Sequence, residues 1–521
     1  MKLKSLLAST VIALSAGFIT PASAFNLHFR LAEDPETLYG VQTISVTASD
    51  VMGTYLTERL VYIDPRGQPA PWLAESWTVS DDQTLISFTL RQGVQFHDGT
   101  PFNAEAVKAQ FDAILDPANA SPVLPMLGPL KDIRVAGEFE VEFEFETPYA
   151  PFFNNISVGY MGINSPAAVA KHGNRYGRNV VGTGPYKLVR WTPGSRIELE
   201  RFDQFIQWRN DALNKGLPHA DKVILTVIRE DSVALAALET GELTGATLQA
   251  DIIDRFAHDP AFKVILNDNT TNLVFLEFNQ NRPPFNEPLV REAIGHAINR
   301  SAAVAAAWSG YASEATGPLA RGIPGFDADV AEKYGTRFDL ERARELFAQA
   351  GWQDTNGNGT LDRDGQEARW VIHSYSGFTH IERTLAVIQS NLRQVGVEIE
   401  LVTSDWGAFY PSLLRDDWDM TLLRWTSFDP NIMSRLFRSP GHRQHLLENP
   451  EVDNILDLCD SLMNPPERTE CVSKAQTALL KSHTLVPILT NHVVIATQSK
   501  VEDYNLDFTG LLIPGDVRLS N

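Results

Sequence analysis

The chain has 521 residues, of which 43% are hydrophobic, with 34 glycines, 30 prolines and 2 cysteines. This composition is typical of a globular protein of two or three domains, and it excludes a disordered tail, a fibre and a disulfide-rich miniprotein. The formal charge is −21 at pH 7. A surface of that sign repels nucleic acid and anionic lipid head groups, so no nucleic-acid partner is expected.

The N-terminal segment, residues 1–24, has the three parts of a secretory signal. Lys2 and Lys4 form a charged region, residues 6–19 are apolar, and Ala-Ser-Ala at residues 22–24 is a small-residue cleavage site. A membrane anchor is the alternative, but the apolar run is shorter than the roughly 20 residues that a spanning helix needs. No cysteine directly follows the cleavage site to carry a lipid. We therefore expect a mature chain free in a periplasm, with a charge of −23 once the two lysines are removed.

Cys459 and Cys471 are the two cysteines, and in an exported protein they meet an oxidising compartment. We therefore expect a structural disulfide between them. Asn464-Pro465-Pro466 must break a helix between the two, so the bridge would clamp two helices at their turn. In the chain-entropy model such a short loop contributes about 2 to 3 kcal/mol. Catalytic thiols and a metal site are the alternatives, but no histidine lies beside the pair at metal-ligand spacing.

An early part of the mature chain predicts a lobe of strands and helices. Residues 84–90 alternate apolar and polar side chains, and residues 138–146 alternate more strictly, with five glutamates on one face. This pattern is typical of half-buried antiparallel strands, and the glutamates then form a solvated face. Between the strands, Asn103 is suited to cap an amphipathic helix. Residues from about 61 to 178 are therefore interpreted as an α+β lobe.

The second half of the chain predicts a separate α/β lobe. Apolar residues at helical spacing mark helices at residues 290–298 and 385–395, and the second helix stops at Gly396. A strand at residues 397–401 follows at once, which completes an α/β unit. Buried strands are expected near the C-terminus, at residues 485–489 and 493–496.

The sequence gives little support for an enzyme. It contains neither a Gly-x-Ser-x-Gly elbow nor a His-Glu-x-x-His zinc helix. Gly177 and Gly182 have the spacing of a phosphate loop, but Thr183 stands where a lysine is needed. Gly182-Thr-Gly184-Pro-Tyr186 is more simply a tight turn that uses the conformational freedom of glycine and leads into a strand. No enzymatic activity and no catalytic residue are expected.

A polar segment at residues 354–362 has oxygen-bearing side chains at the positions of a calcium loop. The twelfth position is Gly365, where a calcium loop carries a bidentate glutamate. A hairpin tip held by Asx turns is the structural interpretation, and a weak structural calcium site is the alternative, with ligands Asp354, Asn356, Asn358 and Asp362. No other cofactor or metal is expected. His442 and His445 are interpreted as parts of a solvated loop and not as a metal pair.

Aromatic and charged residues alternate in one stretch of the second half. Large aromatic side chains most often belong to a core, but a tryptophan beside ions and before Pro430 is typical of a pocket rim, where a flat ring stacks on a sugar or a side chain. The stretch contains Asp405, Trp406, Phe409, Tyr410, Arg424, Trp425, Phe428 and Asp429.

Several short motifs follow one another along nearly the whole mature chain. They are Leu73-Ala-Glu-Ser-Trp77, Phe96-His-Asp-Gly-Thr-Pro-Phe102, Gly182-Thr-Gly-Pro-Tyr186, Phe278-Asn279 with Pro284-Phe285, Val290-Arg-Glu-Ala293, Asn299-Arg300, Gly351-Trp352, the Asp354 to Asp362 segment, and Gln389-x-x-Leu392-x-x-Val395-Gly-Val397. Each is weak alone. Together they closely resemble the large periplasmic solute-binding proteins of ABC importers, family 5, which includes peptide, nickel and opine types.

The resemblance implies an α/β two-lobed periplasmic-binding-protein fold of type II, cluster C-like, with an inserted α+β accessory domain. Solute would be held between two binding lobes, which close by a hinge motion and then dock on an ABC transporter permease in the inner membrane. We expect a monomer divided as follows: signal peptide, 1–24; first ligand-binding lobe, 25–60, 179–268 and 489–521; accessory lobe, 61–178; second ligand-binding lobe, 269–488.

The resemblance leaves the solute open. In peptide-binding relatives, an aspartate three residues after the tryptophan that matches Trp425 receives the peptide ammonium, but here that position is Phe428 and Asp429 follows it. The whole chain looks most like members that import opines, particularly the sugar-phosphodiester agrocinopines, and this is the first hypothesis. Oligopeptide or dipeptide binding is the alternative. A secreted hydrolase and a chaperone or signalling receptor on the same fold are the hypotheses from other classes.

A sugar phosphate requires guanidinium or backbone N–H donors for its phosphate, and aromatic faces and Asp or Asn side chains for its sugar. If the Trp425 ring stacks on the solute, we expect Trp425→Ala to weaken solute binding by about 1 to 3 kcal/mol. Each candidate also has a structural interpretation, as a strand end for Asn279 or a surface tyrosine for Tyr39. The segments that the family uses in its cleft supply the candidates Tyr39, Ser49, Asn279, Asn281, Arg424, Trp425 and Asp429.

Overall fold

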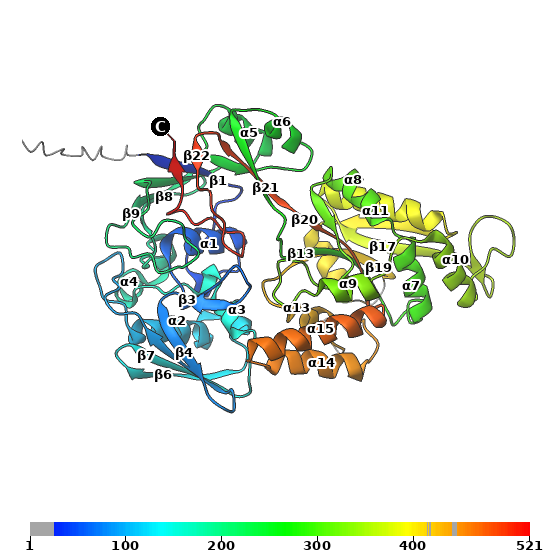
Figure 1. Cartoon of the computed structure of the whole chain (residues 1–521), viewed down its shortest axis with the longest axis horizontal. Helices are drawn as coiled ribbons and strands as arrows, with labels where there is room; N and C mark the ends of the chain where they lie inside the picture. Colours follow the sequence, from blue (N-terminus) through cyan, green and yellow to red (C-terminus); the bar gives the residue numbers. More distant parts are fainter. Residues whose placement is uncertain (1–24, 414, 416–417, 440–444, 521) are drawn as a thin grey trace, which may run out of the picture.

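The structure is a computed structural model, which describes residues 25–413, 415, 418–439 and 445–520. Figure 1 shows two bodies side by side, joined at one end by crossing strands and approached at the other end by the helices α14 and α15. The predicted signal peptide, residues 1–24, lies outside the described residues. Within the described ranges, no helix is both long and apolar enough to cross a membrane.

The first body is built on a seven-stranded mixed sheet, in which the N-terminal strand β1 pairs in parallel with β10 and β11. The strands come from stretches far apart in the sequence, because β21 arrives from near the C-terminus. Helices α5 (Asp231–Glu239) and α6 (Ile253–Ala257) pack on β11 and β12 over a small apolar core. In sheet order the strands are β12 (Phe262–Asn267), β21 (Val493–Gln498), β11 (Gly245–Thr247), β1 (Asn26–Leu31), β10 (Lys222–Val227), β9 (Arg196–Arg201) and β8 (Tyr186–Thr192).

A four-stranded antiparallel sheet forms the other end of this body. Helix α2 (Ala104–Leu115) packs on it, and the Asn103 side chain caps the helix by accepting the N–H of Ala106 at 3.1 Å, as predicted. On β7 the apolar residues are buried, while the glutamates face outward, where Glu142 and Glu144 pair with Arg134. One continuous apolar core runs from this sheet into the seven-stranded sheet. The strands are β4 (Ala74–Val79), β5 (Leu85–Leu90), β7 (Glu140–Phe145) and β6 (Leu130–Gly137).

The second body is built on a six-stranded mixed sheet with its own large core. The predicted helix and strand around Gly396 form as an α/β unit, because Gly396 has a φ of +80° and ends the turn that leads from α11 into β18. Helices α7 (Pro288–Ala297), α8 (Arg300–Trp308), α10 (Leu340–Gln349) and α11 (Thr379–Arg393) cover the sheet. Its strands are β14 (Ala312–Glu314), β20 (Leu485–Asn491), β13 (Asn272–Phe278), β19 (Met420–Thr426), β17 (Arg369–Tyr375) and β18 (Glu398–Ser404).

Two chain segments connect the bodies, residues 268–271 between β12 and β13, and residue 492 between β20 and β21. Asn272 and Asn491 tie the segments together. The Asn272 side-chain amide donates to the carbonyl oxygen of Asn491, and the Asn491 N–H donates to the Asn272 side-chain oxygen, both at 3.0 Å. Because β20 stays in the second sheet as far as Asn491, the second crossing lies after that residue and not at residue 489 as expected.

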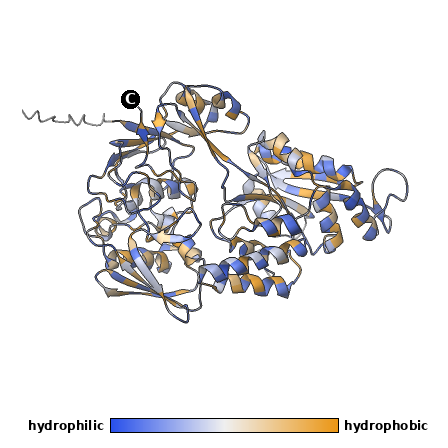
Figure 2. Ribbon diagram, viewed as in Figure 1, coloured by the Kyte–Doolittle hydropathy of each residue, from blue (hydrophilic) through white to orange (hydrophobic). Residues whose placement is uncertain are grey.

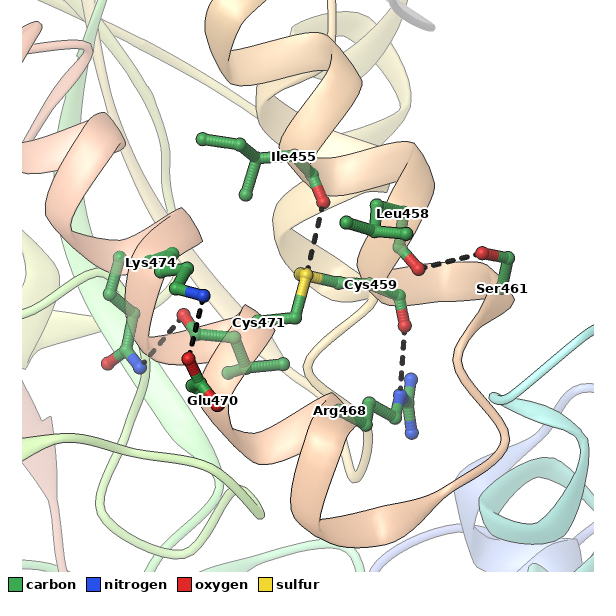
Figure 3. Close-up of a disulfide and its surroundings, with 10 residues drawn as sticks. Ile455, Leu458, Cys459, Ser461, Arg468, Glu470, Cys471 and Lys474 are labelled. Carbon is green, nitrogen blue, oxygen red and sulfur yellow. Dashed lines mark hydrogen bonds and ion pairs between the residues drawn. A yellow bond between two sulfur atoms is a disulfide. The ribbon is translucent and has the colours of Figure 1, made fainter.

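The predicted disulfide is confirmed. Cys459 and Cys471 are bonded, with their Cα atoms 5.4 Å apart, and they join α14 (Pro450–Ser461) to α15 (Pro465–Lys481) (Figure 3). Asn464 caps the second helix through its side chain. Figure 2 shows hydrophilic and hydrophobic residues alternating along both helices, as expected of helices that pack on one face.

The tip of this helical hairpin contacts the first body. The N–H of Ala150 donates to the carbonyl oxygen of Asp460 at 2.9 Å, and the N–H of Met463 donates to the side-chain oxygen of Gln83 at 2.9 Å. The two bodies therefore touch at the helical hairpin as well as at the crossing strands (Figure 1).

The Gly182-Thr-Gly184 segment leads into β8 as predicted, but for a different reason from the one expected. Neither glycine has a positive φ. Instead, a Cβ atom on Gly184 would lie 2.6 Å from the carbonyl carbon of Leu56, and one on Gly182 would overlap the Leu56 carbonyl oxygen. The Gly184 N–H donates to that oxygen at 3.0 Å. Glycine is required here because two main chains approach closely.

This contact predicts that Gly184→Ala destabilises the protein by about 1 to 3 kcal/mol, because the methyl group would meet main-chain atoms that cannot rotate away. Urea unfolding measures the change. Gly216→Ala is the matched control, because Gly216 also lacks a positive φ and its Cβ would come no closer than 3.4 Å to a side-chain atom. Equal stability of the two variants would contradict the prediction.

Candidate functional site between the two bodies

A cavity of about 320 Å³ lies between the two bodies, beside the crossing segments. The first body contributes α1 (Val46–Val51), residues 157–159 and residues 509–511, and the second contributes Arg424, Thr426 and Phe428 from the end of β19. The crossing segments supply Asn267, Asn269–Asn272, Asn491 and Val493. The volume is in the range of small-molecule sites, which are commonly about 300 to 1,000 Å³.

The lining of this cavity is mostly uncharged and polar. Two ionisable side chains line it, the acid Asp50 from the first body and the base Arg424 from the second, so the acidity of the chain does not extend to this lining. Amide and hydroxyl groups offer both donors and acceptors, the chemistry expected for a small polar solute. They belong to Ser49, Ser157, Asn267, Asn269, Thr270, Thr271, Asn272, Thr426, Asn491 and Thr509.

The Arg424 guanidinium is available for a ligand. Strand alternation turns Arg424 and Thr426 toward the cavity. Among the described residues, no hydrogen bond or ion pair engages the Arg424 side chain. Burial first, and then the charge of Arg424, lower the pKa of His380 to about 4, so this histidine is neutral at pH 7.

Asp50 faces the same cavity from α1, a helix that Ser45 caps by accepting the N–H of Ala48 at 3.3 Å. Burial, followed by the charge of Asp507, raises the pKa of the Asp50 carboxyl to about 7. Within the described part of the chain, the Asp50 carboxyl has no hydrogen-bond or ion-pair partner. A half-buried acid in this position is costly to ionise unless a cation approaches it.

The raised pKa gives a pH-dependent stability difference. An acid whose pKa is higher in the folded state holds its proton more tightly there, so its contribution to stability is full below about pH 4 and is lost as pH rises through about 7. We expect Asp50→Asn to gain stability over the wild type between those pH values, by on the order of 1 to 3 kcal/mol. Urea unfolding at several pH values measures this, with exposed Asp81→Asn as control. Parallel pH profiles of wild type and Asp50→Asn would contradict it.

Of the residues predicted from sequence as ligand contacts, Ser49 and Arg424 line the cavity. Trp425 does not. It lies between Arg424 and Thr426 on β19, so its ring is on the opposite face of the strand and packs against the second core. Phe428, which replaces the expected aspartate, is the aromatic residue of the predicted stretch that lines the cavity. Stacking of the solute on Trp425 is therefore not part of the proposed site.

Asp429 was predicted as a ligand contact, but its carboxylate is bound by other side chains of the protein. It is 3% exposed and forms a two-pronged ion pair with Arg468, at 2.6 and 2.8 Å. The side-chain amide of Asn154, in α3 (Phe152–Ile156) of the first body, donates to the same carboxylate at 2.5 Å. The carboxylate thus links the second body to the first and does not face the cavity.

Tyr39, Asn279 and Asn281 are also away from the cavity. Tyr39 is buried edge-to-face against Tyr176, with ring centres 4.9 Å apart, and burial raises its pKa to about 12. Asn279 lies just beyond β13, at the end opposite Asn272, and its amide donates to the carbonyl oxygen of Trp418 at 3.0 Å. Asn281 follows it on the surface. None of the three lines the cavity between the two bodies.

Sequence reasoning missed Asp50 and the amide-rich crossing. Asp50 directly follows a predicted contact, Ser49, but one acid does not stand out among 65 Asp and Glu residues. The polar run Asn267-Asp-Asn-Thr-Thr-Asn272 between two strands was the available signal for the crossing.

Two segments were considered as metal sites from the sequence, the histidines 442 and 445 and the polar segment at residues 354–362. His442 lies outside the described residues. His445 is buried and not solvated as expected, because its Nε2 lies 2.9 Å from the Glu277 carboxylate. In the residue 354–362 segment, the Asp354 carboxylate accepts the N–H groups of residues 357, 358 and 359, the Asx-turn arrangement. No group of three His, Cys, Asp or Glu residues in the described ranges is placed to hold a metal, and calcium binding there stays a prediction.

Comparison with known proteins identifies the family. The family model for bacterial extracellular solute-binding proteins, family 5, matches residues 68–444, well over half of the chain. The chain belongs to this family, and it is a periplasmic solute-binding protein of an ABC importer. Its relatives are named as binding proteins and not as enzymes.

The relatives differ in what their names say they bind. The glutathione-binding protein GsiB of Escherichia coli (strain K12) is 28% identical over 478 residues, which cover 86% of this chain and 84% of that protein. NikA from Brucella suis, solved with Fe(III)-EDTA, has a TM-score of 0.83 at 22% identity and covers 95% of this chain and 100% of its own. AgaA from A. tumefaciens R10, solved with agropinic acid, has a TM-score of 0.72 at 24% identity, with coverage of 95% and 99%. These structures support the two-lobed α/β fold.

Proposed function

We propose that this receptor captures a small polar solute of the opine or sugar-phosphodiester kind, such as agrocinopine, in the cavity between its lobes and delivers it to an ABC permease. Arg424 carries the proposal, because its guanidinium has no ion-pair partner in the described part of the chain and lines a cavity of amides and hydroxyls, which suits a solute with an anionic group. The ring of Phe428 and the hydroxyl of Ser49 complete the contacts.

The binding lobes follow the sheets. The seven-stranded sheet is the first ligand-binding lobe, the four-stranded sheet with α2 is the accessory lobe, and the six-stranded sheet is the second ligand-binding lobe. The crossing segments with the Asn272–Asn491 amide pair are the hinge. A solute that touches both lobes only when they are closed stabilises the closed form by those extra contacts.

Oligopeptide or dipeptide binding is the alternative function. Because the Asp429 carboxylate is paired with Arg468, it is not free to bind the ammonium group of a peptide after the end of β19. A screen by thermal shift tests both functions, with opines, sugar phosphodiesters and dipeptides as separate sets. Stabilisation by the opines or by the sugar phosphodiesters supports the first proposal. Stabilisation by dipeptides alone supports the alternative, and no stabilisation by any set contradicts both.

Two further assays address the other classes. Uptake of the bound solute in cells that lack the permease distinguishes transport from a chaperone or signalling role, since a transport receptor requires the permease. A search for product after incubation with the solute tests a secreted hydrolase. We also propose that residues 1–24 are a cleaved signal, so N-terminal sequencing of the exported protein should begin at Phe25.

A further inference from the structure

We propose that the solute is dipolar: a cationic amine binds Asp50 of the first lobe, and an anionic group of the same molecule binds Arg424 of the second. This inference rests on the function proposed above and narrows its solute class. It favours amine-bearing opines, and other amino-acid-derived solutes, over sugar phosphodiesters.

The groups around Asp50 give it no cation. Asp507 accepts the N–H groups of Thr509 and Leu511 and pairs with Arg209 at 3.2 Å, so that arginine is already engaged. Arg59, the other buried cation of this region, donates to main-chain carbonyls. The hydroxyl of Tyr160 donates to a main-chain carbonyl as well. None of these described groups supplies Asp50 with a cation, so a cationic group of the solute can pair with it in the cavity.

Arg424 presents the opposite charge in the same way. Its guanidinium lines the cavity, and the polar groups near it, His380 and Tyr375, bring no negative charge. No ion pair joins Arg424 to Asp50 among the described residues. The two groups therefore face one small cavity from different lobes, and no described residue forms an ion pair with either side chain.

The pair of charges discriminates between solute classes. An anionic solute without an amine would pair with Arg424 but bring a second negative charge into the cavity that holds Asp50. A neutral sugar would cover the half-buried Asp50 and Arg424 side chains and give neither a counter-charge, which is costly. A solute with both groups pairs with each lobe at once, so it also favours the closed form, in which both contacts exist.

The state of Asp429 determines which end of the solute faces which lobe. The acid at the end of β19 in the second lobe is held by Arg468 and Asn154, so the second lobe offers the cavity a cation and not an acid. The cationic end of the solute therefore lies on the first lobe.

Isothermal titration with matched solutes tests this inference. The probes are N-carboxyalkyl amino acids of the opine type and dipeptides, each free, amine-acetylated, or carboxyl-amidated, together with a sugar phosphodiester. With wild type, we expect acetylation and amidation each to weaken binding by at least about tenfold. In Asp50→Asn, the free and acetylated forms should bind within about threefold of each other, while amidation still weakens binding. Asp81→Asn, an exposed acid outside the cavity, should behave as wild type.

The outcomes separate this inference from the proposed function. Binding of the phosphodiester, or of acetylated solutes as tightly as free ones, would overturn the dipolar solute and leave the receptor function standing. An unchanged preference for the free amine in Asp50→Asn would overturn the role of Asp50. No binding by any probe would overturn the proposed function and this inference with it. Circular dichroism of Asp50→Asn shows that the variant is folded, and Asp50→Glu, which keeps the charge, should retain the preference for the amine.

Discussion

Replacing Arg424 by glutamine is expected to weaken solute binding by about 2 to 5 kcal/mol, because the variant loses the cation that meets the anionic group of the solute in the cavity. The fold should tolerate the change, since no hydrogen bond or ion pair of the Arg424 side chain is found among the described residues. The loss should therefore appear in the dissociation constant and not in the melting temperature of the solute-free protein.

Titration calorimetry with the solute found in the screen measures this effect. Arg369→Gln is the matched control, because Arg369 is an exposed arginine on β17 of the same sheet whose ion-pair partner is Glu367. Screened surface pairs of this kind contribute little, and Arg369 does not line the cavity. Equal affinity of Arg424→Gln and Arg369→Gln would show that Arg424 does not bind the solute.

Replacing Arg468 by methionine is expected to lower the free energy of unfolding by about 3 to 5 kcal/mol, because it leaves the buried carboxylate of Asp429 without its counter-charge. Arg468 also donates to the carbonyl oxygen of Cys459, at 3.2 Å, so it fixes the disulfide-linked hairpin against the second lobe (Figure 3). Arg468 thus joins Asp429 to the hairpin, whose apolar faces also pack in the second core.

Urea unfolding under non-reducing conditions measures the loss. The double variant with Asp429→Leu and Arg468→Met is the control, since removal of both charges leaves no buried unpaired ion and should recover most of the stability. A double variant as unstable as Arg468→Met alone would show that packing, and not the unpaired charge, causes the loss.

Local patterns predicted much of the fold. The strict alternation of β7, the Asn103 cap of α2 and the glycine that ends the α11 turn each depend on neighbouring residues, and all three appear as predicted. The disulfide was predictable because two cysteines twelve positions apart in an exported chain have few other partners. The sequence resemblance supplied the two-lobed architecture, which the family match confirms.

The site was harder to predict because it joins segments that only the fold brings together. Ser49 and Arg424, predicted as ligand contacts, line the cavity, but Trp425 beside Arg424 points the other way, since a shift of one residue on a strand changes the face. The sequence predicts that the Asp429 carboxylate is free to bind a ligand. In the structure, Arg468 from α15 and the side-chain amide of Asn154 from α3 bind it instead. The need for Gly184 likewise came from the distant main chain of Leu56, which no local pattern reveals.

The central claim is that solute binds in the cavity beside the crossing segments. A second inter-body cavity, of about 350 Å³, lies between α5 and residues 249–251 on one side and the helices α8 and α11 on the other, and is lined by Gln249, Trp308 and His380. Hydrogen exchange of the amide groups, with and without solute, separates the two sites. We predict slower exchange in residues 46–51, 267–272, 424–428 and 509–511 when solute is bound. Slower exchange confined to residues 249–251, 307–308 and 377–383, or no change in either set, would contradict the account.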